Sequence, residues 1–407
     1  MARTDFDIVV VGAGSAGLAA VASIRKRRPD LAIAVIDPAS VHYYQPGFTM
    51  VGGGIFEAGQ TVRPMKDLIP AKVTWLQQPV ARFEPEADAV VLGDGSRVTY
   101  RQLVVATGLT LNWSGVDGLT ETLGRNGVTS NYRFDLAPYT WQLVSGLREG
   151  TALFTQPPMP IKCAGAPQKV MYLACSHWER AGILDRIDVQ FHNAGGVLFG
   201  VADYVPALMD HVARYGIELD LGETLVAVDG AARKATFRTQ AGEKTVGFDM
   251  IHVVPPQVAP EVVAQSPLAG EGGWVDVDQE TLRHTRYANI FALGDCTTTP
   301  NAKTAAAARK QAPVAAANLV ANIEGRPLPF AYDGYGSCPL IVERGKALLA
   351  EFGYGGKLLP TFPTWLIDGT RPSRLAWWLK SEALPQIYWH AMLKGREWLA
   401  GPALRKG

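Results

Sequence analysis

The hydrophobic residues of this chain cluster in short, nearly uninterrupted apolar runs that end at glycine-rich or polar turns. Runs of this length suit strands that are buried on both faces of a parallel sheet. They cover residues 6–11, 32–36, 103–106, 151–155, 187–191 and 288–293. Helical stretches follow several of them, one to about Arg27, one over Gln168–Arg180 and one from Thr304 onward. This alternation of strands and helices predicts an α/β fold.

The turn after the first run has a phosphate-binding pattern. It reads Gly12-Ala13-Gly14-Ser15-Ala16-Gly17, and the second strand ends at Asp37, 20 residues after Gly17. Glycines permit the tight turn and a close approach to pyrophosphate, while an acid in this place accepts hydrogen bonds from ribose hydroxyls. We therefore predict a dinucleotide bound by Gly12, Gly14, Ser15, Gly17 and Asp37. The alternative is a glycine-rich turn without a ligand.

Two later segments indicate that the dinucleotide is FAD. One apolar run ends in Ala-Thr-Gly at Thr107 and Gly108, as in flavoproteins with two dinucleotide domains. Another closes on Gly294-Asp295, which resembles the second FAD motif of those proteins, where the Asp binds the ribityl chain. Lys303 precedes the next helix and could stabilise negative charge on a reduced flavin. The alternative for Lys303 is a solvated lysine at a helix start.

The middle of the chain resembles a second Rossmann-like domain whose ligand site has been rebuilt. Where GxGxxG would be expected, residues 156–167 carry four prolines, which lack the N–H groups that cradle phosphate. The following strand ends in His192-Asn193, without a carboxylate for a ribose. We infer that NAD(P)H binding has been lost here. The predicted domains are residues 1–112 with 271–330 for FAD, 113–270 for the second Rossmann-like domain without a functional NAD site, and 331–407 for a redox-cysteine loop and an amphipathic membrane and quinone region.

Two cysteines 175 residues apart, Cys163 and Cys338, lie in short segments bounded by proline and glycine. Neither segment has the pattern of the middle of a helix or strand, so both are expected in loops. Cys163 precedes a helix and has Lys162 and Lys169 nearby, and a helix dipole and cations both favour a thiolate. If the two cysteines meet at the flavin, a nucleophile can attack a sulfur bridge between them and displace one as thiolate. From the residues alone, two unrelated free thiols stay open as the alternative.

The other candidate groups have structural interpretations. Cys175 is expected in the core of a helix, and Cys296 is expected to be a small buried residue near the cofactor. No pair of histidines has metal-ligand spacing, and His192 is a weaker candidate for a proton shuttle than for a structural role. We therefore expect no metal site.

Composition and charge exclude several classes of protein. With 47% apolar and 19% charged residues the chain is globular, and its formal net charge of +1 gives no reason to expect nucleic acid as a partner. Residues 371–407 carry seven Lys/Arg against two Asp/Glu, with four interleaved tryptophans. Short amphipathic helices over Arg374–Glu382 and Ile387–Lys394, separated at Pro385, would suit a helix lying on a membrane surface. The alternative is an aromatic-rich lid packed on the core.

The motifs together resemble sulfide:quinone oxidoreductases, specifically the subgroup that includes the mitochondrial enzyme. The resemblance spans nearly the whole chain, and its most specific pieces are residues 160–169, 273–278, 294–297, 303–307 and 332–340. It implies a flavoprotein with two dinucleotide-binding domains and a C-terminal membrane-associated region. It also implies non-covalent FAD, and a polysulfide bridge between Cys163 and Cys338 that sulfide attacks. In this subgroup the cysteine matching Cys163 faces the flavin and that matching Cys338 meets solvent.

The resemblance further implies the partners of the reaction. Sulfane sulfur passes to a small acceptor such as glutathione or sulfide, and electrons pass through FAD to membrane quinone. The enzyme is expected as a peripheral, monotopic protein on the cytoplasmic face of a bacterial inner membrane, and a homo-oligomer stays open. Other subgroups use a third cysteine and histidines, but residues 127–132 hold no cysteine and residues 200–202 no histidine. A covalent flavin is therefore not expected.

Two other functions stay open at this stage. A type II NADH:quinone reductase is the nearest enzymatic alternative, and the rebuilt second nucleotide site argues against it. A flavin-based sulfur or redox sensor without turnover is the other alternative. Reduction of the flavin by sulfide and not by NADH would distinguish a sulfide:quinone oxidoreductase from the NADH:quinone reductase. Catalytic reduction of quinone would distinguish the enzyme from the sensor.

Overall fold

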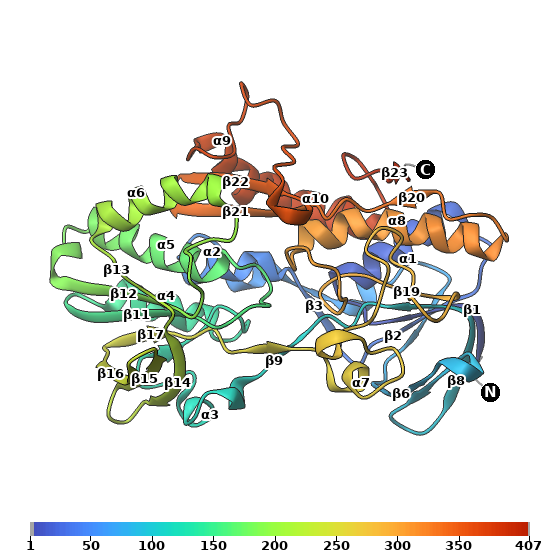
Figure 1. The fold of residues 1–407 in the computed structure, drawn as a ribbon, viewed down its shortest axis with the longest axis horizontal. Coiled ribbons are helices and arrows are strands. Elements are labelled where there is room, and N and C mark those ends of the chain that lie inside the picture. The colour runs from blue at the N-terminus through green and yellow to red at the C-terminus, as the bar shows by residue number, and fades with distance from the viewer. Residues whose placement is uncertain (1–3, 406–407) are drawn as a thin grey trace.

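The computed structural model describes residues 4–405 and contains two parallel sheets flanked by helices (Figure 1). The first sheet has the order β5-β2-β1-β8-β7-β6, with β19 also beside β8. Its strands are β1 Asp5–Val11, β2 Ile33–Ile36, β5 Val73–Leu76, β6 Val80–Glu84, β7 Ala89–Leu92, β8 Arg97–Val105 and β19 Ile290–Ala292. β1, β2, β5, β8 and β19 pair in parallel, and β6 and β7 form an antiparallel extension. The carboxyl ends of β1, β8 and β19 therefore meet at one edge, where ligands bind in such sheets.

The second sheet is wholly parallel, in the order β10-β17-β11-β12-β13. Its strands are β10 Val128–Thr129, β11 Gly150–Gln156, β12 Ile187–Asn193, β13 Glu218–Leu221 and β17 Met250–His252. An antiparallel sheet of β14 Thr224–Asp229, β15 Lys234–Thr239 and β16 Gly242–Gly247 accompanies it. Two Rossmann-like sheets in one α/β chain confirm the predicted fold class.

Short strand pairs join these units. They are β3 Val41–Tyr43 with β4 Val62–Pro64, β9 Thr110–Leu111 with β18 Gln257–Val258, β20 Phe330–Ala331 with β23 Ala403–Leu404, and β21 Gly336–Glu343 with β22 Lys346–Phe352. The β21–β22 hairpin packs on the second unit, since Leu340, Val342 and Leu348 belong to the same buried cluster as Phe154 and Met171. The predicted domain boundaries stay a prediction.

Helices cover the sheets. They are α1 Ser15–Arg27, α2 Phe48–Gly52, α3 Leu119–Thr122, α4 Ala137–Gly146, α5 Ala166–Arg180, α6 Val205–Tyr215, α7 Glu261–Ala264, α8 Ala305–Ile323, α9 Arg374–Trp378 and α10 Leu384–His390. The two helices of the first unit, α1 and α8, lie side by side and supply much of its largest buried cluster, including Leu18, Val21 and Leu319. Thr304 caps α8 by accepting a hydrogen bond from the amide of Ala307, so the helix begins where the sequence predicts.

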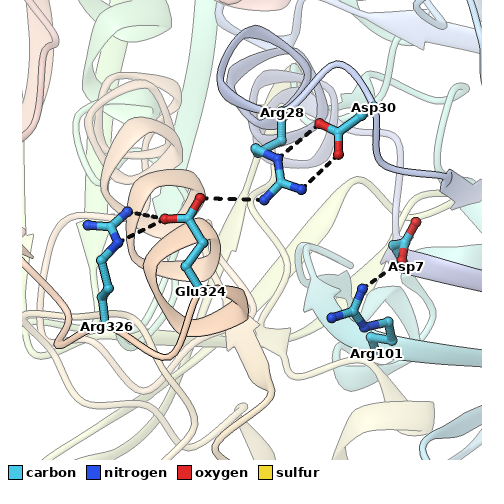
Figure 2. Close-up of polar contacts among 6 residues, drawn as sticks. All are labelled: Asp7, Arg28, Asp30, Arg101, Glu324 and Arg326. Carbon is cyan, nitrogen blue, oxygen red and sulfur yellow. Dashed lines mark hydrogen bonds and ion pairs between the residues drawn. The ribbon is translucent and has the colours of Figure 1, made fainter.

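Ion pairs tie the far ends of α1 and α8 together, away from the ligand edge (Figure 2). Arg28, just after α1, donates to Asp30 at 2.9 and 2.7 Å and to Glu324, just after α8, at 3.4 Å. Arg326 donates to the same Glu324 carboxylate, and Arg101 of β8 pairs with Asp7 of β1 at 3.0 Å. These partly exposed pairs fix the register of elements and contribute little stability each.

The C-terminal residues differ from their prediction. Instead of two helices separated at Pro385, residues 374–390 run as α9, a π-helical turn Leu379–Ala383 and α10 without a break. Pro385 lies in the first turn of α10, where the missing N–H costs nothing. In Figure 1, α9 lies at the top of the molecule above β22, and α10 lies between the β21–β22 hairpin and α8.

Candidate functional site

The predicted dinucleotide turn has the geometry that a bound pyrophosphate requires. A Cβ on Gly12, which has φ +99°, would lie 2.4 Å from the Ala106 carbonyl oxygen, and one on Gly17 would lie 1.8 Å from the Gly12 carbonyl oxygen. Only glycine fits at these two close approaches. Gly14, in contrast, has no atom within 4 Å of such a Cβ, so open space lies beside the N-terminus of α1. The turn therefore leaves room for a ligand where its amides point.

Asp37 lies at the carboxyl end of β2 and orients this turn. Its Oδ2 accepts from the Ala13 amide at 2.6 Å, and its Oδ1 accepts from the Ala39 amide at 2.8 Å. Ser15 begins α1, and its hydroxyl lies 2.6 Å from the hydroxyl of Tyr388. The sequence did not predict this use of the Ser15 side chain.

The two later FAD segments bring unsatisfied polar groups to the same edge of the sheet. The Thr107 hydroxyl is buried without a hydrogen-bond partner, and Gly108, with φ +70°, has open space beside it. The Gly294 amide donates to Gln311 Oε1 at 2.7 Å, while the Gln311 amide nitrogen is buried without a partner. Buried orphan groups beside open space fit a polar cofactor that satisfies them.

Lys303 is not the solvated lysine of the alternative interpretation. Its side chain is buried, and its Nζ donates to the carbonyl oxygens of Asp295 at 2.7 Å and Thr297 at 3.0 Å. The ammonium also lies 4.3 Å from the centre of the Trp274 ring. Burial lowers the pKa of Lys303, and the Asp295 carboxylate opposes that shift.

The structure brings Cys163 and Cys338 together. Their Sγ atoms are 3.2 Å apart, although 175 residues separate them in the chain. Cys163 lies between β11 and α5, with φ +54°, and its amide donates to the Lys303 carbonyl at 2.8 Å. Cys338 reaches it from β21. Gly165 makes this approach possible, because a Cβ there would lie 2.7 Å from Cys338 Sγ and 2.2 Å from Leu340 Cδ2.

Two expectations for Cys338 are wrong. It lies in strand β21 instead of a loop. Pro339 has no N–H to donate to a neighbouring strand, but a hairpin of only two strands tolerates this missing donor. Its side chain is also buried, at 2% exposure, so in this chain it does not meet solvent as the resemblance implied. Gly165 and Leu340 cover it. Cys163 is the more exposed of the two.

Lys169, on the first turns of α5, faces both sulfurs. Its Nζ lies 3.1 Å from Cys163 Sγ and 3.5 Å from Cys338 Sγ, and its side chain is buried. A hydrogen bond from Cys338 and the charge of Lys169 hold the pKa of the Cys163 thiol well below its usual value, against the effect of burial. The pair is therefore poised with the thiolate on Cys163 and the proton on Cys338.

Three further lysines make this site cationic. Lys162 donates to Gln45 Oε1 at 2.7 Å, and Lys303 is described above. Lys380, from the π-helical turn, is 2% exposed and donates to the Pro46 carbonyl at 2.7 Å. Burial and then the charge of Lys169 lower the pKa of Lys380 to about 7. The sequence analysis missed Lys380, and its one signal was a lysine directly after the apolar Trp-Trp-Leu stretch.

The remaining candidates have structural surroundings. Cys175 and Cys296 are fully buried, as predicted. His192 is buried against the Phe237 ring, at 3.9 Å between ring centres, and bonds Glu223 at 2.8 Å. His192, Asp220 and Glu223 have metal-ligand chemistry, but the Lys244 ammonium lies 2.9 Å from Asp220 and 3.5 Å from Glu223 and supplies the positive charge.

Exposed apolar side chains concentrate near the C-terminus. Of the 13 large apolar side chains that are exposed among residues 4–405, eight belong to residues 358–404. Trp365, at 84%, is the most exposed and lies outside the segment that the sequence analysis singled out. Trp378 and Trp398 are exposed as well, whereas Trp389 is buried. None of the helices over residues 4–405 is both long and apolar enough to cross a bilayer.

Comparisons with known proteins show the family of the chain. The family model described as pyridine nucleotide-disulphide oxidoreductase matches residues 6–143. The chain is 41% identical over 394 residues to the mitochondrial sulfide:quinone oxidoreductase of Dictyostelium discoideum, covering 96% of this chain and 86% of that protein. It is 35% identical over 409 residues to the mitochondrial enzyme of Mus musculus, covering 100% and 90%.

A solved structure shares the fold. The sulfide:quinone oxidoreductase of the hyperthermophilic bacterium Aquifex aeolicus matches with a TM-score of 0.82 at 20% identity, covering 100% of this chain and 98% of that one. The identities to the two mitochondrial enzymes extend over nearly the full length of this chain. The chain therefore belongs to the sulfide:quinone oxidoreductase family and is an FAD-dependent oxidoreductase.

Proposed function

We propose that this enzyme oxidises sulfide at Cys163 and Cys338 and delivers the electrons through FAD to membrane quinone. One observation carries the assignment of the site: two cysteine sulfurs 3.2 Å apart, with a buried ammonium 3.1 Å from one of them, between the two Rossmann-like units. A thiolate stabilised in this way is both a leaving group and an electron donor.

The distance between the sulfurs supports a bridge of one additional sulfur atom. An S–S bond is about 2.05 Å long, so two sulfurs joined through a third at an ordinary valence angle lie about 3.3 Å apart. The two Sγ atoms lie 3.2 Å apart, which matches that span without movement of β21 or of the loop that holds Cys163. We propose that the resting enzyme carries this polysulfide bridge.

The bridge defines the chemistry. Hydrosulfide forms a new S–S bond to the bridging sulfur atom. The S–S bond between the bridging sulfur and Cys163 Sγ breaks, and its electron pair leaves on Cys163 Sγ. The added sulfur stays on Cys338 as sulfane sulfur and passes to a small thiol such as glutathione, or to sulfide. Per turnover, one hydrosulfide and one thiol become one persulfide, with release of one proton and one electron pair. Because a leaving group of lower pKa leaves faster, Cys163 is the side that departs.

The lysines have separate roles in this proposal. Lys169 stabilises the departing thiolate, which it contacts at 3.1 Å. Lys162, Lys303 and Lys380 give the site a positive potential that attracts the hydrosulfide anion. Lys380, whose pKa is about 7, can exist in either protonation state near neutrality and is placed to supply or accept a proton.

The cofactor is held by residues of the first unit. Gly12, Gly14 and Gly17 leave the approach to the pyrophosphate open, and Thr107 and Gln311 present the buried groups that lack partners. When bound, FAD supplies the two-electron acceptor that links sulfur oxidation to quinone reduction. We propose non-covalent binding, because residues 127–132 offer no cysteine for a covalent link.

A nicotinamide as reductant is not favoured. In the loop between β11 and α5, the Lys162 amide donates to Gln257 Oε1 at 2.7 Å and the Cys163 amide donates to the Lys303 carbonyl at 2.8 Å. Amides engaged within the protein do not cradle the phosphates of a second dinucleotide.

We propose that the exposed C-terminal apolar side chains dock the enzyme on a membrane surface. Trp365, Leu366, Trp378 and Trp398 combine exposed indole or aliphatic groups with neighbouring Lys and Arg, which suits a monotopic contact. The relatives from Dictyostelium discoideum and Mus musculus are mitochondrial enzymes. They give no support to the predicted placement on the cytoplasmic face of a bacterial inner membrane. A homo-oligomer stays a prediction.

An anaerobic titration tests the proposed function. Sulfide should reduce the flavin of the wild-type enzyme, and a quinone analogue should reoxidise it through repeated turnovers, whereas NADH should leave the flavin oxidised. Flavin that NADH reduces faster than sulfide would overturn the assignment. One reduction by sulfide without quinone turnover would favour a sensor instead.

A further inference from the structure

A buried chain of hydrogen bonds links the dinucleotide turn to the C-terminal segment. Tyr388 of α10 is 3% exposed, and its hydroxyl lies 2.6 Å from Ser15 Oγ and 2.6 Å from His42 Nε2. His42 Nδ1 lies 3.0 Å from the Ala13 carbonyl oxygen. The chain therefore begins and ends on the turn that faces the pyrophosphate, and α10 supplies its central member.

The Ala13 carbonyl oxygen can only accept a hydrogen bond, and this fixes the donor and the acceptor in every bond of this buried chain of hydrogen bonds. A carbonyl oxygen has no proton, so His42 Nδ1–H donates to Ala13. Burial lowers the pKa of His42, so its ring is neutral and Nε2 accepts from Tyr388. Tyr388 oxygen then accepts from the Ser15 hydroxyl. Each proton is assigned, and removal of the Tyr388 hydroxyl leaves both the Ser15 hydroxyl and His42 Nε2 without this partner.

A second set of contacts fastens the same segment to the other end of α1. Glu397 accepts from Ser23 Oγ at 2.6 Å and from Arg27 Nη2 at 3.0 Å. Gly395 lies so close to α1 that a Cβ there would be 2.7 Å from the Ala22 carbonyl oxygen. Residues 388–397 therefore contact α1 from its first residue to its last turn.

We propose that residues 388–397 are part of the cofactor-binding apparatus, with Tyr388 as the positioning residue that holds the dinucleotide turn. Because coupling between two binding events is reciprocal, bound FAD should in turn hold this segment on α1. The proposal rests on the FAD binding argued above and adds that the segment directly before the exposed Trp398 is ordered together with the cofactor.

The substitution Tyr388→Phe tests the first half. It removes one oxygen and keeps the ring that packs on Tyr44 and Trp389, at 4.8 and 5.1 Å between ring centres. We expect the affinity of apoprotein for FAD, measured by quenching of free flavin fluorescence, to fall at least about tenfold. Tyr215→Phe is the matched control, because Tyr215 is a buried tyrosine whose hydroxyl donates to the Val342 carbonyl at 3.1 Å, far from the turn in the second unit. Wild-type FAD affinity in Tyr388→Phe would overturn the proposal.

Limited proteolysis of the wild-type protein tests the second half without any variant. Lys394 and Arg396 lie within the segment and are trypsin sites. We expect cleavage after them to be at least about fivefold faster in apoprotein than in holoprotein, because opening must precede cleavage. Equal rates would overturn the coupling. Sulfide is absent from both experiments, so a protein that binds FAD but is not reduced by sulfide would refute the proposed function and leave this inference standing.

Discussion

The charge on Lys169 gives the most quantitative prediction. In the substitution Lys169→Gln, a neutral amide replaces the ammonium that lies 3.1 Å from Cys163 Sγ. Coulomb's law at an effective dielectric constant of about 20 gives about 5 kcal/mol for a thiolate and an ammonium at this distance. Each 1.36 kcal/mol corresponds to one pH unit in a pKa, so the pKa of the Cys163 thiol should rise by about three to four pH units in this variant. Water that enters beside the shorter side chain reduces this change, and a rise of about two pH units in the pKa is a conservative expectation.

Alkylation by iodoacetamide measures this effect, because the thiolate is the reacting species. Cys163 is the only one of the four cysteines that is not buried, so the reduced enzyme reports mainly on this residue. The pH at which the alkylation rate reaches half its maximum should be higher by at least about two pH units in Lys169→Gln. Lys310→Gln is the control, since the Lys310 ammonium lies over the Tyr335 ring and not beside a sulfur. A midpoint within about half a pH unit of the wild-type value would refute the electrostatic argument.

Three further predictions concern other parts of the site. The substitution Gly165→Ala should separate the two sulfurs, because its Cβ would lie 2.7 Å from Cys338 Sγ, and should abolish flavin reduction by sulfide with FAD still bound. The control Gly59→Ala, where no atom lies within 4 Å of a Cβ, should leave flavin reduction by sulfide unchanged. The pKa of Lys380 is about 7 in the folded protein and about 10.4 in the unfolded chain, so the stability of the wild type rises with pH between these values. The substitution Lys380→Met should therefore raise the melting temperature more at pH 7 than at about pH 9. An equal gain at both pH values would contradict the buried charge. Trp378→Ser and Trp398→Ser should each weaken sedimentation with anionic lipid vesicles several-fold, and unchanged binding of the double variant would exclude these side chains as anchors.

Substitutions suit the membrane test better than truncation does. Removal of residues 371–407 would also remove Lys380 from the sulfur site and Tyr388 from the dinucleotide turn. Loss of activity after truncation would then not report on membrane contact.

The parts of the fold that the sequence predicts are those with a strong local pattern. β1, α1 and β2 follow from one apolar run, one glycine turn and one acid, and the structure places their bounds within a residue or two of the prediction. Thr304 as the start of α8 is also a local signal, because a threonine cap is read from its own neighbours. These elements need no distant partner to be recognised.

The parts that the sequence did not predict depend on distant partners. Cys338 lies in a strand because β22 pairs with it, although Pro339 and the nearby glycines favour a loop. Lys380 lies buried in a π-helical turn and interacts electrostatically with both cysteines, and no spacing rule marks such a turn. The link between Ser15 and Tyr388 joins residues 373 apart, so only the fold reveals it.

One measurement tests the central claim most directly: anaerobic reduction of the flavin by sulfide in Cys163→Ser, Cys338→Ser and the control Cys175→Ala, with FAD content checked in each. The proposed site predicts that both serine variants keep FAD but are not reduced by sulfide on the timescale of the wild type, while Cys175→Ala is reduced normally. Reduction of either serine variant at the wild-type rate would show that the electrons reach the flavin without this pair of sulfurs.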